Sequence, residues 1–257
     1  MRSRNKILGL AAVLVSAPVH AQNDPMVIPY VSIMAENMHY GNMLRSMFRR
    51  DGRLQESSTS RSRPSSLTAP SPIGSTNYFA KAQSPQGFAV ALTYQPSDAL
   101  SRKVLDGYIS RASKTAPDGA RDFASQLAKH DYRKIYRGLL SGTGLAENDA
   151  ADAVAAYTAL GWMIANDQLT DISPRAYQAL RQQIAARAPG NSSFAPGVRA
   201  ELGEEMKLLA VTLHAGWQGA QREGNLRQYS DGVAALFKRN DIDLRALRLT
   251  NNGFAAR

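Results

Sequence analysis

Two aspartates at the start of an apolar stretch are candidates for acid–base catalysis. Asp149 and Asp152 are one helical turn apart, a spacing that permits the carboxylate separation of glycoside hydrolases. An envelope glycan hydrolase is therefore one hypothesis. The alternative is structural: Asn148 or Asp149 caps the helix, and Asp152 is carried inward, where a carboxylate needs a donor. The expected partner of Asp152 is a basic residue just upstream: Arg133, Lys134 or Arg137.

Thioether and imidazole groups gather near the N-terminus, in residues 22–50. They are Met34, Met38, His39, Met43 and Met47, with the methionines paired one helical turn apart. Soft thioether ligands select Cu(I), and imidazole also suits copper, so a copper site is one hypothesis. Methionine is also a common apolar filler and suits adaptable binding surfaces. Packing in a core, or against a partner protein, is the other interpretation of these residues.

The sequence lacks the residues or spacings that several other kinds of catalytic and metal site require. There is no cysteine, so thiol catalysis, thiolate metal sites and disulfides are excluded. The histidines outside the first 21 residues, His39, His130 and His214, lie in no metal-ligand spacing. We interpret Glu201, Glu204 and Glu205, which share one predicted helix, as a solvated face. We therefore predict a non-enzymatic binding domain with no catalytic residue and no cofactor.

The chain begins with a pattern typical of a signal peptide. Arg2, Arg4 and Lys6 precede an apolar run, and residues 19–21 (VHA) form a small-residue cleavage site. Cleavage after Ala21 predicts a periplasmic or secreted protein without a membrane span. The formal charge of +10 falls to +7 without the three leader cations. Nucleic acid is not an expected partner; a protein or an envelope component is, and the oligomeric state stays open.

The element that must position any site is a predicted central helix over residues 148–166. Between residues 153 and 165 only Thr158 and Gly161 are not apolar, which indicates a helix buried on nearly all sides. The run is shorter than the ~20 residues of a membrane span. We therefore expect an all-α fold, an irregular bundle of six to seven helices around this one.

The rest of the chain divides at composition changes. Residues 51–87 are rich in Ser, Pro and Arg and predict a disordered linker. Residues 88–254 form the predicted helical domain, with Ser173-Pro174 and Pro196 as helix starts. A minimal two-stranded pairing of residues 88–94 with 247–250 is a further expectation.

Three pieces of the chain, in order, resemble a family of exported proteobacterial helical proteins known as a domain of unknown function. They are residues 148–167 (NDAADAVAAYTALGWMIAND), the helix from Pro196 that carries Trp217, and residues 241–254 (DIDLRALRLTNNGF). The resemblance spans roughly residues 92–254. It implies export and a helical fold, and it implies no reaction and no catalytic residues. The matching positions are Asn148, Ala151 to Ala153, Tyr157, Trp162, Leu247 to Thr250, Gly253 and Phe254.

Overall fold

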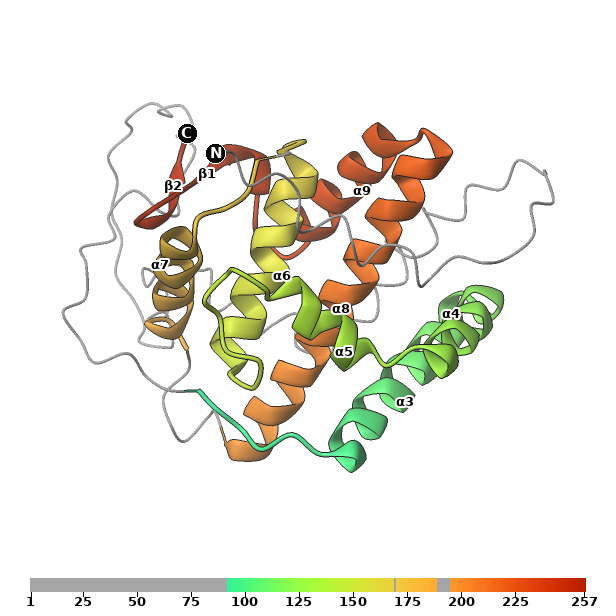
Figure 1. The fold of residues 1–257 in the computed structure, drawn as a ribbon. Helices are drawn as coiled ribbons and strands as arrows, with labels where there is room; N and C mark the ends of the chain where they lie inside the picture. Colours follow the sequence, from blue (N-terminus) through green and yellow to red (C-terminus); the bar gives the residue numbers. More distant parts are fainter. Residues whose placement is uncertain (1–91, 169, 189–194) are drawn as a thin grey trace, which may run out of the picture.

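The computed structural model describes residues 92–168, 170–188 and 195–257 of the chain (Figure 1). In this part it holds seven α-helices and one two-stranded antiparallel sheet, which confirms the all-α expectation. The predicted leader, the Met-rich segment and the linker lie outside the described residues. None of the helices in the described residues combines the length and the hydrophobicity that a membrane span requires.

Helix α6 (Ala150–Ala165) is the predicted central helix, and nearly every side chain on it is buried. Asp149 caps it by accepting hydrogen bonds from the backbone N–H groups of Ala151 and Asp152. Helices α7 (Pro174–Ala185), α8 (Pro196–Glu223) and α9 (Leu226–Lys238) pack around it. The close approach of α9 to α6 requires a small residue on α6, because a Cβ at Gly161 would clash with the ring of Phe237 on α9.

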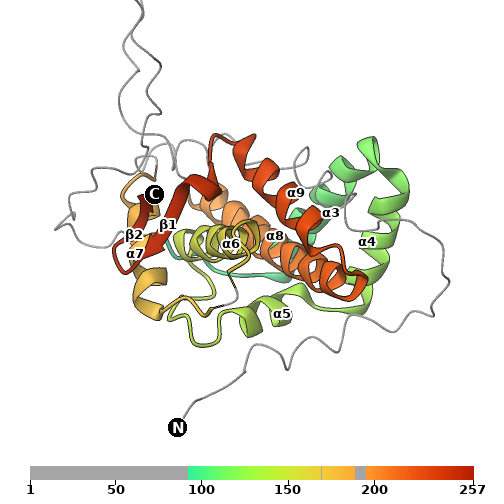
Figure 2. The ribbon, with the colours of Figure 1, turned by 90° about the horizontal axis from the view of Figure 1, so that it is seen from above.

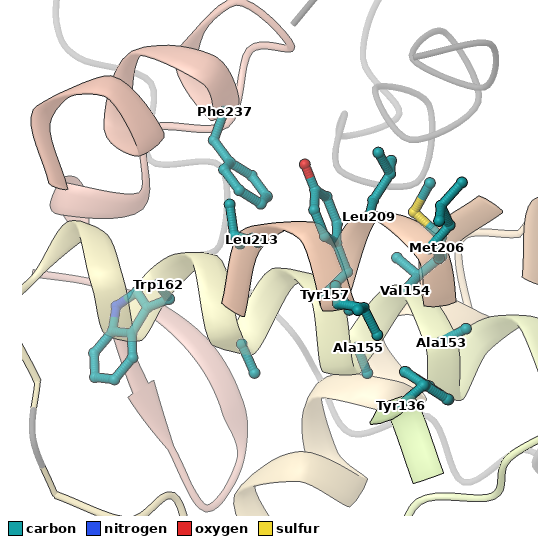
Figure 3. Close-up of a cluster of buried hydrophobic side chains, with 14 of the residues drawn as sticks. Tyr136, Ala153, Val154, Ala155, Tyr157, Trp162, Met206, Leu209, Leu213 and Phe237 are labelled. Carbon is teal, nitrogen blue, oxygen red and sulfur yellow. The ribbon is translucent and has the colours of Figure 1, made fainter. Parts of the chain in front are cut away.

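The apolar core lies between α6, α8 and α9. Figure 3 shows Tyr157 reaching from α6 toward Phe237 of α9, with Leu209 and Leu213 of α8 beside them. The rings of Tyr157 and Phe237 stack with their centroids 5.0 Å apart. The burial of such large side chains stabilises the fold by about 1.5–3 kcal/mol each.

Helices α3 (Asp98–Thr115) and α4 (Pro117–Lys129) form a hairpin at one side of the bundle (Figures 1 and 2). Proline at the first position of α4 explains the sharp turn after Ala116. Helix α4 packs chiefly against α3. Its buried residues are only Ala120 and Phe123, so most of its surface is exposed. Helix α5 (Tyr132–Leu139) then brings the chain back to α8.

The C-terminal end forms a 3₁₀ turn, η2 (Leu244–Ala246), and a hairpin of β1 (Leu247–Thr250) and β2 (Gly253–Ala256). The predicted strand at residues 247–250 is present, but it pairs with β2 and not with the described end of the expected partner. Of that expected partner the structure describes residues 92–94, where Thr93 forms an antiparallel bridge with Asp149. The two-residue turn makes the local hairpin the shorter connection, which explains the difference.

Candidate functional site: two buried carboxylate clusters

The two predicted aspartates do come together, in what we call the Asp149 cluster: Asp149, Asp152 and Arg181. All three side chains are at most 10% exposed. Arg181 reaches in from α7 and places Nη2 3.2 Å from Asp149 Oδ2 and Nε 3.3 Å from Asp152 Oδ1. One guanidinium therefore bridges two carboxylates at the first turn of α6.

The carboxylate of Asp149 is fully occupied by groups of the protein itself. Oδ1 accepts the two backbone N–H groups that it caps, and Oδ2 accepts the backbone N–H of Leu92 at 2.8 Å as well as Arg181. Four donors use the four lone pairs that an ionised carboxylate offers. Asp149 thus has no acceptor site left for a substrate.

Asp152 is buried as predicted, but its expected partners were wrong. Arg133 pairs with Asp98 and Asp131, and Arg137 pairs with Glu147, at exposed positions. The partner is Arg181, because the side of α6 that carries Asp152 faces α7 rather than α5. Burial raises the pKa of Asp152 above its usual value, against the opposing effects of the Ala146 N–H and of Arg181.

A second site, the Glu204 cluster, is larger: Tyr94, Ser101, Tyr132, Asn148, Glu204 and Lys207. Glu204 and Lys207 lie one turn apart on α8, and their side chains are 0% and 1% exposed. Glu204 Oε1 accepts from Tyr94 at 2.9 Å and from Lys207 at 2.6 Å. Its Oε2 accepts from Ser101 and Tyr132, each at 2.9 Å.

The ionised form of Glu204 is favoured despite its burial. Loss of solvent opposes ionisation, but Lys207 and the hydroxyl donors outweigh it, so the pKa of Glu204 lies below its usual value. Lys207 Nζ also donates to Asn148 Oδ1 at 2.8 Å. It lies 5.1 Å from the ring centre of Tyr94 and 5.9 Å from that of Tyr136, distances typical of cation–π contacts.

The two clusters meet at the consecutive residues Asn148 and Asp149, and both hold the chain where it enters the bundle. Tyr94 N donates to Asn148 O, and Leu92 O accepts from Ala150 N, each at 3.0 Å. The ring of Tyr94 lies directly on Gly203, where any Cβ would clash with it. Strand-like pairing and a tyrosine thus fasten the first described residues to α6 and α8.

The expectation of a solvated glutamate face on α8 was wrong for two of its three residues. Glu204 is in the Glu204 cluster, and Glu205 pairs with Arg111 of α3 at 3.0 Å with a side chain 3% exposed. Glu201 alone faces outward, toward the exposed Lys103. The sequence signal that could have found them is the apolar run at residues 208–213 (LLAVTL) on the same helix, which indicates a helix buried on most sides.

The remaining candidate residues stay apart from both clusters. His214 is buried on α8 beside Trp217, and burial lowers its pKa to about 4. His130 is half-buried at the end of α4. Among the described residues no three His, Asp or Glu side chains are grouped to hold a metal ion. The Met-rich group, Met34 to Met47, lies outside these residues, so its copper hypothesis stays a prediction.

Chemically, the two clusters resemble structural ion pairs more than an acid–base pair for hydrolysis. A general acid or base needs a carboxyl oxygen within hydrogen-bonding reach of the substrate. Asp149 and Glu204 spend their oxygens on internal donors, and Asp152 is held by Arg181 and by the N–H of Ala146. Comparison of the chain with family models, with curated proteins and with solved structures finds no match.

Proposed function

We propose that this chain is an exported, non-enzymatic helical domain that binds a protein or an envelope component in the periplasm or outside the cell. The observation that carries the proposal is the occupancy of its buried carboxylates. Asp149 and Glu204 accept hydrogen bonds from the protein itself on both oxygens. Asp152 accepts the N–H of Ala146 on Oδ2, and its Oδ1 lies in an ion pair with Arg181. Binding through the outer surface is the activity left to such a domain.

Export is the part of the proposal that rests on sequence. The charged start, the apolar run and the small residues before Gln22 are typical of a cleaved leader. The resemblance of residues 148–167 and 241–254 to exported proteins supports the same compartment. The absence of cysteine is compatible with it, because the helical core is large enough to fold without disulfides.

We place the binding surface on the α3–α4 hairpin. Among the described residues, Leu226 is the only large hydrophobic side chain that is exposed, so a partner must be recognised mainly through polar and charged groups. Helix α4 offers such groups on a surface that the bundle leaves open, including Arg121, Asp122 and Lys129. Aromatic and apolar anchors are scarce there, which favours a binding mode of charge complementarity.

The test starts with the mature protein immobilised and exposed to an envelope extract of the source organism. The captured component is then purified and titrated against the protein in solution. A double variant of the hairpin, Arg121→Glu with Lys129→Glu, is expected to weaken binding about tenfold or more. The control makes the same charge change at a different place, with Arg222→Glu and Arg227→Glu, and is expected to bind normally.

Two results would contradict the proposal. One is the absence of any component that binds the purified protein in titration. The other is release of soluble fragments from peptidoglycan by the wild-type protein that Asp152→Asn abolishes while the variant stays folded. The second result would establish the glycan hydrolase in its place.

A further inference from the structure

We propose that Lys207 and Asn148 become joined by an intramolecular isopeptide bond, with Glu204 transferring the protons. The product is a secondary amide between Nζ of Lys207 and Cγ of Asn148, and the leaving group is ammonia. The proposal concerns a covalent modification of the chain by itself. It is independent of the binding activity, which requires no chemistry.

The geometry holds the amine of Lys207 within hydrogen-bonding distance of both other reacting groups. Nζ of Lys207 is 2.8 Å from the amide oxygen of Asn148 and 2.6 Å from Oε1 of Glu204. The nucleophile therefore rests against the carbonyl that it would attack, and against a carboxylate that can take its proton. Holding reactants at such separations removes much of the entropic barrier of a two-body reaction.

The surroundings favour attack on the Asn148 amide by the amine of Lys207 over attack by water. The side chains of Lys207 and Glu204 are 1% and 0% exposed, so water has little access to the reacting atoms. The tyrosines 94, 132 and 136 lie around the pair, by hydrogen bond or by ring contact. The ion pair of Lys207 and Glu204 is the resting state, and passage of a proton along their 2.6 Å hydrogen bond gives the neutral amine that attacks.

The steps balance without an oxidant, a reductant or a cofactor. The ammonium of Lys207 gives one proton to the carboxylate of Glu204, and the resulting amine attacks Cγ of Asn148. The new N–C bond forms as the amine loses a second proton, and the bond from Cγ to Nδ2 breaks as Nδ2 gains one through Glu204. Ammonia leaves, and one proton remains on Glu204. Asn148 is half-buried, so the ammonia has a route to solvent.

The cross-link would tie the residue before the cap of α6 to the middle of α8, across 59 residues of chain. These two helices pack against each other in the centre of the described domain. A covalent tie between them would restrict the unfolded chain as a disulfide does, in a protein without cysteine. The fold would then resist unfolding outside the cell irrespective of redox conditions.

The experiment is peptide mapping of the purified mature protein by mass spectrometry after trypsin digestion. A modified Lys207 is not cleaved, so the expected product is a branched peptide in which residues 200–222 are joined to residues 138–175. Its mass should equal that of the two peptides less one ammonia, and fragmentation should place the link at Lys207 and Asn148. Recovery of only the linear peptides 200–207 and 138–175 would overturn the proposal.

Variants separate the cross-link from other losses of ammonia. Lys207→Arg should abolish the branched peptide; ammonia loss at Asn148 that persists in this variant would indicate a succinimide and would overturn the proposal. Glu204→Gln, which removes the proton acceptor, should lower the branched yield at least about tenfold. Glu201→Gln on the same helix is the matched control and should leave the yield unchanged. Full cross-linking in Glu204→Gln would exclude the role of Glu204.

Discussion

The two ends of helix α6 are held by different physics. At its N-terminal end, Asp149 and Asp152 meet Arg181, and the neighbouring Glu204 cluster adds a lysine and three hydroxyl groups. Toward its C-terminal end, aromatic packing dominates: Tyr157 stacks on Phe237, and Trp162 packs against Phe254. The side-chain hydrogen bonds there go to backbone carbonyls, from Trp162 Nε1 to Leu247, from Asn166 to Leu244 and from Arg245 to Ala165.

The difference teaches where specificity comes from in this fold. Apolar side chains at the C-terminal end tolerate several arrangements of similar volume, whereas each charge at the N-terminal end is stable only beside its own partner. The polar end therefore fixes which segments meet, including the entering chain at Leu92. The apolar end supplies most of the burial energy.

The largest effect at the apolar end should come from Trp162→Ala. Trp162 is 8% exposed, so its truncation leaves a cavity and removes one of the two hydrogen bonds to Leu247 O, the other coming from Arg257 Nε. We expect a loss of about 3–5 kcal/mol in the free energy of unfolding, measured by denaturant titration. Trp217→Ala, at a partly buried position on α8, is the control and should cost less. Equal costs would mean that α6 is not the centre of the core.

At the polar end the comparable change is Arg181→Met. It preserves the apolar stem and leaves two carboxylates buried without their cation, which should cost about 3–5 kcal/mol. Arg137→Met, at an exposed pair with Glu147, should cost no more than about 1 kcal/mol. Adding Asp152→Asn to Arg181→Met should recover part of the loss. If it recovers none, the three groups do not act as one cluster.

The same contrast explains what the sequence could and could not predict. The central helix, a polar cap at Asn148 or Asp149 and the buried Trp162 follow from local patterns of apolar residues and cap residues. The partner of Asp152 and the inward Glu204 depend on which helices meet, and Arg181 and Tyr94 are distant in sequence from the groups they bind. A nearby arginine is the natural guess from sequence, but helix packing, not proximity along the chain, selects the partner.

Acid should weaken the fold through a group that belongs to neither cluster. His214 is neutral in the fold, with a pKa of about 4 against 6.5 when exposed, so the unfolded chain binds its proton first. Stability is therefore lost as pH falls from 6.5 toward 4, by about 3 kcal/mol for a shift of that size. Denaturant titrations between pH 7 and pH 4.5 measure this loss. Their pH range does not extend below the usual pKa of Glu204.

The histidine variant isolates this contribution from the carboxylates. Asp152, with its raised pKa, acts in the opposite direction because the folded state binds its proton more tightly. That effect is common to the wild type and to His214→Asn, so it cancels in the difference between them. His214→Asn should thus lose the extra acid sensitivity, and His130→Asn should keep it. An unchanged pH slope in His214→Asn would assign the acid sensitivity to another group.

The smallest effect tests how the entering chain is fastened at the polar end. Gly203→Ala places a methyl group against the ring of Tyr94, which must then shift from its bond to Glu204. Overpacking of this kind costs about 1–3 kcal/mol. Gly197→Ala, on the same helix with open space around it, should be neutral or slightly stabilising because alanine favours helices. If both substitutions are neutral in denaturant titration, Tyr94 is not seated on α8, and the Glu204 cluster closes without the entering chain.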